Sequence, residues 1–160
     1  MIKYLLIKDV KQMVREIRDN ELTQLLELYL HLHEKEVPED SENLRTMWQK
    51  IKDDKDHHII VYEADGKIVS ACVCVIIPNL SRGIRPHAFI ENVVTHKDYR
   101  GRGYATKCLE RAKEIAVETN CYKMMLFTGA KDEKTLNLYR NAGYNSNDKT
   151  GFIQWIDCEP

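Results

Sequence analysis

A β-branched run that passes through a glycine-containing turn into an amphipathic helix constrains the fold of this chain most strongly. Residues 88–95 have the apolar, β-branched content of a strand, and residues 103–119 repeat apolar side chains at helical spacing. Between them, residues 100–103 read Arg-Gly-Arg-Gly. Glycines let the unpaired N–H groups at a helix start approach an anion without a Cβ clash. The segment therefore predicts a loop that binds a diphosphate, with the charge of its arginines added.

Helical and strand patterns alternate along the rest of the chain. Strands are predicted at about 13–17, 58–63, 68–77, 88–95, 122–127 and 151–156. Helices are predicted at about 20–33, 41–51, 103–119 and 135–142, with Asp19 and Asn20, then Ser41, as N-caps and Gly143 as a C-cap. Asp65-Gly66 predicts a hairpin turn between two strands. The element order is then β-α-α-β-β-β-α-β-α-β.

Composition narrows the class of protein. A length of 160 residues favours one domain over 1–160, and 43% apolar with 31% charged residues is typical of a globular protein. The net charge of -1 gives no basic face for a nucleic acid. No stretch approaches the ~20 apolar residues of a membrane span. The five cysteines include no C-x-x-C pair and no secretory signal precedes them, which predicts reduced thiols in a cytoplasmic protein. The histidines lack the spacing of a metal site.

Other phosphate-binding loops fit the turn less well. A P-loop needs Gly-Lys followed by Ser or Thr, which is absent here. A Rossmann fingerprint needs a third small residue where Thr106 stands. What remains is Arg-x-x-Gly-x-Ala, formed by Arg100, Gly103 and Ala105 after a Val-Val-Thr strand end.

That pattern resembles the signature of the GNAT superfamily of N-acetyltransferases. A second segment, Asn-Leu-Tyr-Arg-Asn-Ala-Gly-Tyr at 137–144, is similar to the aromatic/Leu-Tyr-x-x-x-Gly-Phe/Tyr segment of the same superfamily. Residues 89–94 and 120–123 are locally similar to glucosamine phosphate N-acetyltransferases, whereas 128–131 departs from them. The resemblance implies an α+β fold with a mixed, mostly antiparallel central sheet, flanked by helices and splayed between its fourth and fifth strands. The signature core would span about 58–156 of a single domain.

The resemblance also implies acetyl-CoA as the co-substrate. Main-chain amides of the turn would hold the diphosphate, and the end of the fourth strand would pair with the pantetheine arm. One of the amides of Val93 and Val94 would donate to the thioester oxygen, where negative charge develops. The cofactor-binding residues implied are Val93, Val94, Thr95, Arg100, Gly101, Arg102, Gly103, Tyr104 and Ala105. Lys97 with Arg102 would reach the adenosine 3′-phosphate or form a solvated pair.

Two residues are the catalytic candidates. Tyr139 matches the superfamily's tyrosine near the departing thiolate, although its face of the helix also suits packing in the core. Glu91 is the best general base for the ammonium of the acceptor, against the alternative of a solvated strand glutamate. His87 and His96 are weaker bases. Asp132 stands where relatives carry a coenzyme-binding Asn.

The acceptor is expected to be a primary amine, attacked directly without a covalent acyl-enzyme. Its pocket would be formed by 31–41, Glu91 and 145–150, and acidic residues in the first segment suit a cation. A small molecule is the first expectation; a protein N-terminus or lysine is the alternative, as is a non-catalytic acyl-CoA-binding module. Relatives are often dimers, so a homodimer is also expected.

Overall fold

The structure is a computed structural model that describes residues 13–157 except residue 33. These residues fall into two units that divide after Leu126, and each unit is described by itself. The first unit contains the sheet and most of the helices, and the second contains one helix. One domain over residues 1–160 stays a prediction.

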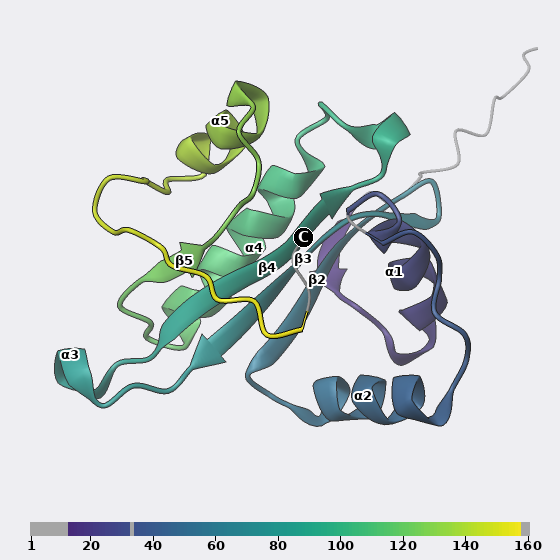
Figure 1. The fold of residues 1–160 in the computed structure, drawn as a ribbon, viewed down its shortest axis with the longest axis horizontal. Helices are drawn as coiled ribbons and strands as arrows, with labels where there is room; N and C mark the ends of the chain where they lie inside the picture. The colour runs from purple at the N-terminus through teal and green to yellow at the C-terminus, as the bar shows by residue number, and fades with distance from the viewer. Residues whose placement is uncertain (1–12, 33, 158–160) are drawn as a thin grey trace, which may run out of the picture. The chain divides into compact units, whose positions relative to one another are not determined.

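A single five-stranded sheet organises the first unit (Figure 1). The strands are β1 (Met13–Glu16), β2 (His57–Ala64), β3 (Lys67–Ile77), β4 (His87–Thr95) and β5 (Met124–Leu126). They lie in the order β1-β2-β3-β4-β5, antiparallel except for the parallel pair β4 and β5. The predicted mixed, mostly antiparallel sheet is therefore confirmed. The hairpin turn is confirmed too, since Asp65 and Gly66 both have positive φ, 53° and 71°.

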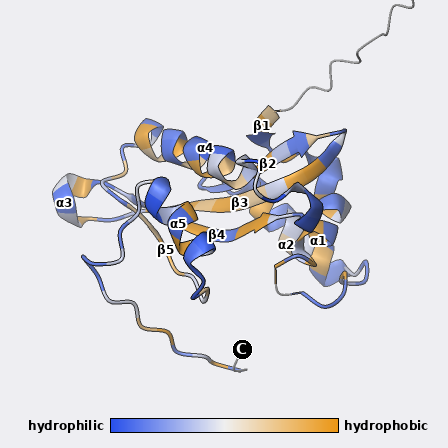
Figure 2. Ribbon diagram, turned by 90° about the horizontal axis from the view of Figure 1, so that it is seen from above, coloured by the Kyte–Doolittle hydropathy of each residue, from blue (hydrophilic) through white to orange (hydrophobic). Residues whose placement is uncertain are grey.

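Helices cover both faces of this sheet. The helical elements of the first unit are η1 (Asp19–Glu21), α1 (Leu22–Tyr29), α2 (Glu42–Asp53), α3 (Ser81–Ile84), η2 (Lys97–Tyr99) and α4 (Tyr104–Glu118). Figures 1 and 2 show α4 on one face of the strands and α1 with α2 on the other. The second unit contains α5 (Glu133–Asn141).

The strand alternation explains this layering. On β2, Ile59 and Val61 face the cluster that contains Leu25 and Leu28 of α1. Cys72 and Cys74 of the central strand β3 are fully buried, as is Cys108 of α4. A strand covered on both faces must be apolar along its whole length, which is the pattern of β3. Figure 2 shows these apolar strands between helices with polar outer faces.

The predicted boundaries of the first two helices are only partly confirmed. The Ser41 cap is confirmed, because its Oγ accepts from the amide of Leu44 at 3.2 Å. The first helix is instead entered through the 3₁₀ turn η1, and Glu21 rather than Asp19 or Asn20 accepts at its start, from the amide of Arg18 at 2.8 Å. That helix ends at Tyr29 rather than near 33.

The predicted last strand at 151–156 is wrong for the described structure. Residues 151–156 form no strand, and the side chains of Phe152 and Ile156 within this segment have exposed fractions of 91% and 84%. An apolar pattern predicts burial, but a strand exists only where its main chain has a partner. Within residues 127–157, the only regular element is α5. The strand predicted at 122–127 is also shorter, since β5 contains only residues 124–126.

Candidate functional site

One edge of β4 is open along its second half. β4 pairs with β3 over nearly its whole length, but its pairing with β5 covers only Ala88, Phe89 and Ile90. Past Ile90, the sheet of the described residues has no further strand on that side. The predicted splaying between the fourth and fifth strands is confirmed. An edge of this kind can take an extended ligand by main-chain hydrogen bonds.

A β-bulge interrupts β4 at the start of this open edge. Val73 pairs with Glu91 and Ala71 with Val94, so Asn92 and Val93 both lie opposite Cys72. Asn92 has a φ of 50°. A bulge turns the strand locally and re-aims its main chain. The exposed Glu91 immediately precedes the bulge. Of the two valines predicted to offer an amide to the thioester oxygen, Val93 lies in the bulge and Val94 follows it.

The turn after β4 presents unpaired main-chain amides. Gly101 and Gly103 have φ of 77° and 80°, left-handed values that favour glycine. Gly103 is the N-cap of α4, and the first amide to bond back onto the turn is that of Lys107, 3.1 Å from the carbonyl oxygen of Gly103. Within the described residues, the amides of 101–106 donate to no protein acceptor. They lie at the positive end of a fifteen-residue helix, which attracts an anion.

The arginine side chains of the turn bind protein groups. Arg100 donates from Nε to the carbonyl oxygen of Thr95 at 3.1 Å and from Nη2 to that of His31 at 3.2 Å. Arg102 donates from Nη2 to the carbonyl oxygen of Asp98 at 3.1 Å, and its Cζ lies 5.0 Å from the centroid of the Tyr99 ring. Both guanidinium groups therefore hold main-chain carbonyl groups in and around the turn, and each keeps further N–H groups beyond these bonds. Contact of either side chain with a phosphate stays a prediction.

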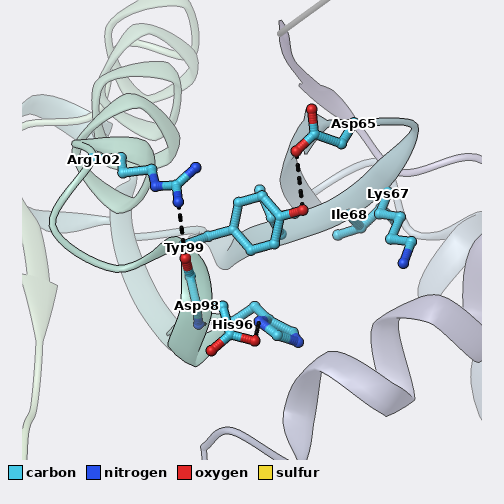
Figure 3. A pocket seen from close by; sticks show the side chains of 8 residues that line it. Asp65, Lys67, Ile68, His96, Asp98, Tyr99 and Arg102 are labelled. Carbon is cyan, nitrogen blue, oxygen red and sulfur yellow. Dashed lines mark hydrogen bonds and ion pairs between the residues drawn. The ribbon is translucent and has the colours of Figure 1, made fainter. Parts of the chain in front are cut away.

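A cavity of about 440 Å³ lies on the side of the turn that faces the β2–β3 hairpin (Figure 3). It is lined by Asp65, Lys67, Ile68, Val69, His96, Asp98, Tyr99 and Arg102. Across it, the Tyr99 hydroxyl donates to Oδ2 of Asp65 at 3.0 Å, and this bond raises the pKa of Tyr99. This hydrogen bond connects the turn after β4 to the β2–β3 hairpin. Sequence reasoning identified the Asp65-Gly66 turn but not this bond.

Neither candidate histidine lies beside Glu91. His96 Nδ1 accepts from the amide of Asp98 at 3.3 Å and so caps η2. The His31 and His96 ring centroids lie 4.2 Å apart. His87 begins β4, four residues before Glu91, which corresponds to about 13 Å along a strand. Glu91 is therefore the exposed candidate base at the bulge itself.

The second unit positions the remaining candidates on α5. Tyr139 is partly buried, and its ring lies edge-on to that of Tyr144 with 6.4 Å between centroids. Gly143, with a φ of 92°, ends the helix as predicted. Asp132 is the N-cap: its Oδ1 accepts from the amide of Thr135 at 2.9 Å, and this bond lowers the pKa of Asp132. This capping bond explains why an acidic residue suits position 132.

Among residues 13–157 without 33, no group of three or more His, Cys, Asp or Glu is placed to hold a metal ion. The same part of the chain has no helix of the length and apolarity that crossing a membrane requires.

Comparison with known proteins agrees with this geometry. Residues 22–144 match the family model described as the Acetyltransferase (GNAT) family. Glucosamine 6-phosphate N-acetyltransferase of Trypanosoma brucei brucei is 26% identical over 136 residues, which are 85% of this chain and 90% of that protein. A putative acetyltransferase from Agrobacterium tumefaciens str. C58 has 35% identity and a TM-score of 0.83, covering 90% of this chain and 99% of its own. The glucosamine-6-phosphate N-acetyltransferase of Arabidopsis thaliana shares the fold, with 22% identity, a TM-score of 0.77 and coverage of 92% and 99%.

Proposed function

Because this chain belongs to the GNAT family of acetyltransferases, we propose that it transfers the acetyl group of acetyl-CoA to the primary amine of a small molecule. The observation that carries the proposal is the row of unbonded amides at 101–106, directly after the open edge of β4. The diphosphate of the coenzyme binds these amides. Its pantetheine arm extends along Val93, Val94 and Thr95 as an added strand. The thioester then lies at the bulge.

The bulge supports direct transfer between amine and thioester. Glu91 removes a proton from the acceptor ammonium, directly or through a water molecule. The free amine attacks the thioester carbon, and an amide of Val93 or Val94 stabilises the negative charge on the oxygen. The new C–N bond forms as the C–S bond breaks. Tyr139 gives a proton to the departing thiolate and is restored from solvent.

The buried thiols of the first unit support direct attack over an acyl-enzyme. Burial raises the pKa of Cys74 and of Cys108 to about 12 and that of Cys72 well above its usual value. A thiol acts as a nucleophile only as the thiolate. None of these three groups can therefore accept the acetyl group near neutral pH.

The α1–α2 connection supports a cationic acceptor. Its side chains are acidic at Glu34, Glu36, Glu39 and Asp40, and all four are exposed. The named relative from Trypanosoma acts on an amino sugar phosphate, which makes phosphorylated amino sugars the first substrates to test. A homodimer and a cytoplasmic location remain predictions.

A thermal shift followed by a turnover assay tests the proposal. Acetyl-CoA at ~100 times its Kd should stabilise the folded protein by ~2.7 kcal/mol, a shift of about 5–10 °C. Coenzyme release is then measured with glucosamine 6-phosphate, glucosamine, a polyamine and a peptide with a free N-terminus. If only the peptide is acetylated, the acceptor is a protein N-terminus rather than a small molecule. Binding without turnover on any amine would favour a non-catalytic acyl-CoA-binding module, and no shift at saturating coenzyme would overturn the proposal.

A further inference from the structure

Ser70 is a buried polar side chain that contacts the end of β4 from within the core. It lies on β3, is 0% exposed, and is paired with Thr95, the last residue of β4. Its Oγ donates to the main-chain carbonyl oxygen of Val94 at 2.8 Å and lies 2.8 Å from Oγ1 of Thr95. A buried hydroxyl costs free energy unless it is hydrogen-bonded, and these contacts meet that cost. Ser70 therefore binds β4 from the core side and not from its open edge.

The hydrogen bonds around Ser70 have a fixed direction. A carbonyl oxygen only accepts, so the single hydroxyl hydrogen of Ser70 goes to Val94. The hydroxyl of Thr95 is then the donor in its contact with Ser70 Oγ. The carbonyl oxygen of Thr95 is bound as well, by Nε of Arg100 at 3.1 Å. Both the side chain and the main chain of Thr95 are therefore held in place.

The bond from Ser70 to Val94 also fixes the direction of the amide of Thr95. Main-chain groups alternate in direction along a strand, and the amide of His96 donates toward β3, to the carbonyl oxygen of Val69 at 2.9 Å. By this alternation, the main-chain groups of Val94 also face β3, and those of Thr95 face the open edge. A peptide unit is planar and trans, so its C=O and N–H point in opposite directions. By holding the C=O of Val94, Ser70 keeps the N–H of Thr95 toward the open edge.

This restraint lies where the strand ladder is disturbed. The pairing of β4 with β3 shifts between Ala71 and Val73, so Val94 is the first β4 residue after the bulge with a regular partner. A bulge disrupts the ladder and increases the local twist of the strand. A side-chain bond to the carbonyl oxygen of Val94 therefore restrains the peptide unit that follows the bulge.

We propose that Ser70 is a positioning residue, which keeps the amide of Thr95 aimed at the pantetheine arm of acetyl-CoA. The inference rests on the proposed function, in which this arm pairs with the end of β4. An arm that adds as a strand is held by main-chain hydrogen bonds, which weaken steeply when the donor is misaligned. Ser70 itself touches no ligand, because its side chain is fully buried. It supports binding of the arm and leaves the diphosphate to the turn at 101–106.

Binding of two nucleotides separates this role from a general structural one. Acetyl-CoA occupies both the turn and the strand edge, whereas 3′-phospho-ADP lacks the pantetheine arm and occupies only the turn. Ser70→Ala should raise the Kd for acetyl-CoA about 5-fold or more, as expected for a misaligned hydrogen bond, and keep that for 3′-phospho-ADP within about 2-fold of wild type. Isothermal titration calorimetry measures both constants. Steady-state kinetics should show a raised KM for acetyl-CoA with kcat within about 2-fold of wild type.

Thr95→Val is a second variant, which keeps the shape of the side chain and removes the donor to Ser70. The Kd for acetyl-CoA should rise by less than in Ser70→Ala, because the bond from Ser70 to Val94 remains. The double variant should bind acetyl-CoA no more weakly than Ser70→Ala, because there the hydroxyl of Thr95 has already lost its acceptor.

Cys74→Ala is the matched control. Cys74 is also fully buried on β3, but it lies opposite Ile90, where β4 is paired on both sides. This variant removes one buried heavy atom, as Ser70→Ala does, and should bind both nucleotides like the wild type. Melting temperatures are recorded for all variants. If Ser70→Ala melts below the assay temperature, the result for Thr95→Val decides, because Thr95 is only partly buried.

The outcomes distinguish this inference from the proposed function. A wild type that binds neither nucleotide overturns both. A wild type that binds acetyl-CoA, with an unchanged Kd in Ser70→Ala and in Thr95→Val, overturns the positioning role alone. Equal weakening of acetyl-CoA and 3′-phospho-ADP in Ser70→Ala also overturns it, because Ser70 would then support the unit as a whole. A lowered kcat with an unchanged Kd for acetyl-CoA contradicts it too, because the effect would then lie in the chemical step.

Discussion

Arg100 donates from Nη2 to the carbonyl oxygen of His31 at 3.2 Å, which attaches the turn before α4 to the segment that follows α1. The same guanidinium donates from Nε to the carbonyl oxygen of Thr95 at 3.1 Å. Arg100 therefore binds the end of β4 and also a main-chain segment that lies 69 residues before it in the chain. In the proposed reaction, these segments begin the acceptor wall and the diphosphate turn.

Arg100→Lys should weaken coenzyme binding, because one ammonium cannot reproduce the planar fork that reaches both carbonyl groups. We expect the KM for acetyl-CoA to rise about 10-fold, with a smaller change in kcat. Steady-state kinetics at a saturating amine measures both. Arg111→Lys is the control, since Arg111 binds only the exposed Glu114 and Glu118 on α4. Equal effects of the two variants would contradict a specific role for Arg100.

Glu91→Gln and Tyr139→Phe should each lower kcat by ~10²-fold or more, because a positioned acid or base contributes about that factor. Neither change should alter the thermal shift with acetyl-CoA. The loss for Glu91→Gln should shrink as pH rises and the free amine accumulates without a base. Glu114→Gln serves as a control on exposed α4. Unchanged turnover in both variants would remove both role assignments.

Protonation of His31 should destabilise the protein as pH falls. Burial lowers the pKa of His31 below its usual 6.5, and the neighbouring His96, Arg100 and Lys97 lower it further against the opposing charge of Asp98. The folded state therefore binds this proton less well than the unfolded state, so stability falls once pH drops below about 6.5.

The measurement is urea unfolding at pH 7.5 and pH 5.5, compared between wild type and His31→Asn. The variant should lose less stability on acidification. The His31→Asn variant should still lose some stability at low pH, because burial also lowers the pKa of His57. His57→Asn measures that part separately. An identical acid loss in wild type and His31→Asn would refute the assignment.

Arg15→Met should destabilise the first unit by ~1–3 kcal/mol, because the buried Glu21 loses its shortest ion pair and keeps only Arg18 as a partner. Arg15 Nη2 lies 2.6 Å from both Glu21 Oε1 and Glu63 Oε2, and the Glu21 side chain is only 7% exposed. Urea unfolding measures the loss. Arg111→Met, which breaks only surface pairs, should cost under about 1 kcal/mol. Similar losses in the two variants would contradict the special burial of the Arg15 group.

Cys72, Cys74 and Cys108 should resist alkylation in the folded protein. All three are fully buried, and burial raises the pKa of Cys74 and Cys108 to about 12. Iodoacetamide at pH 8 followed by peptide mass spectrometry should label them only after unfolding. Cys121, which is partly exposed, is the internal control. Labelling of Cys74 as fast as Cys121 in the native protein would show that the core opens.

The sequence by itself determined the elements whose signals are local. The hairpin at Asp65-Gly66, the cap at Ser41 and the glycine turn before α4 follow from the backbone preferences of those residues. The run at 88–95 and the helix at 103–119 follow from periodicity, which also fixes the buried face of each. The glycine turn was therefore predictable in place, and its binding of a diphosphate stays a prediction.

Only the tertiary structure decided the contacts between distant segments. The bulge opposite Cys72 and the bond from Arg100 to the carbonyl oxygen of His31 join residues far apart in the chain. No local pattern encodes such a partner. The predicted strand at 151–156 failed for the same reason, since an apolar run becomes a strand only where another main chain meets its hydrogen bonds.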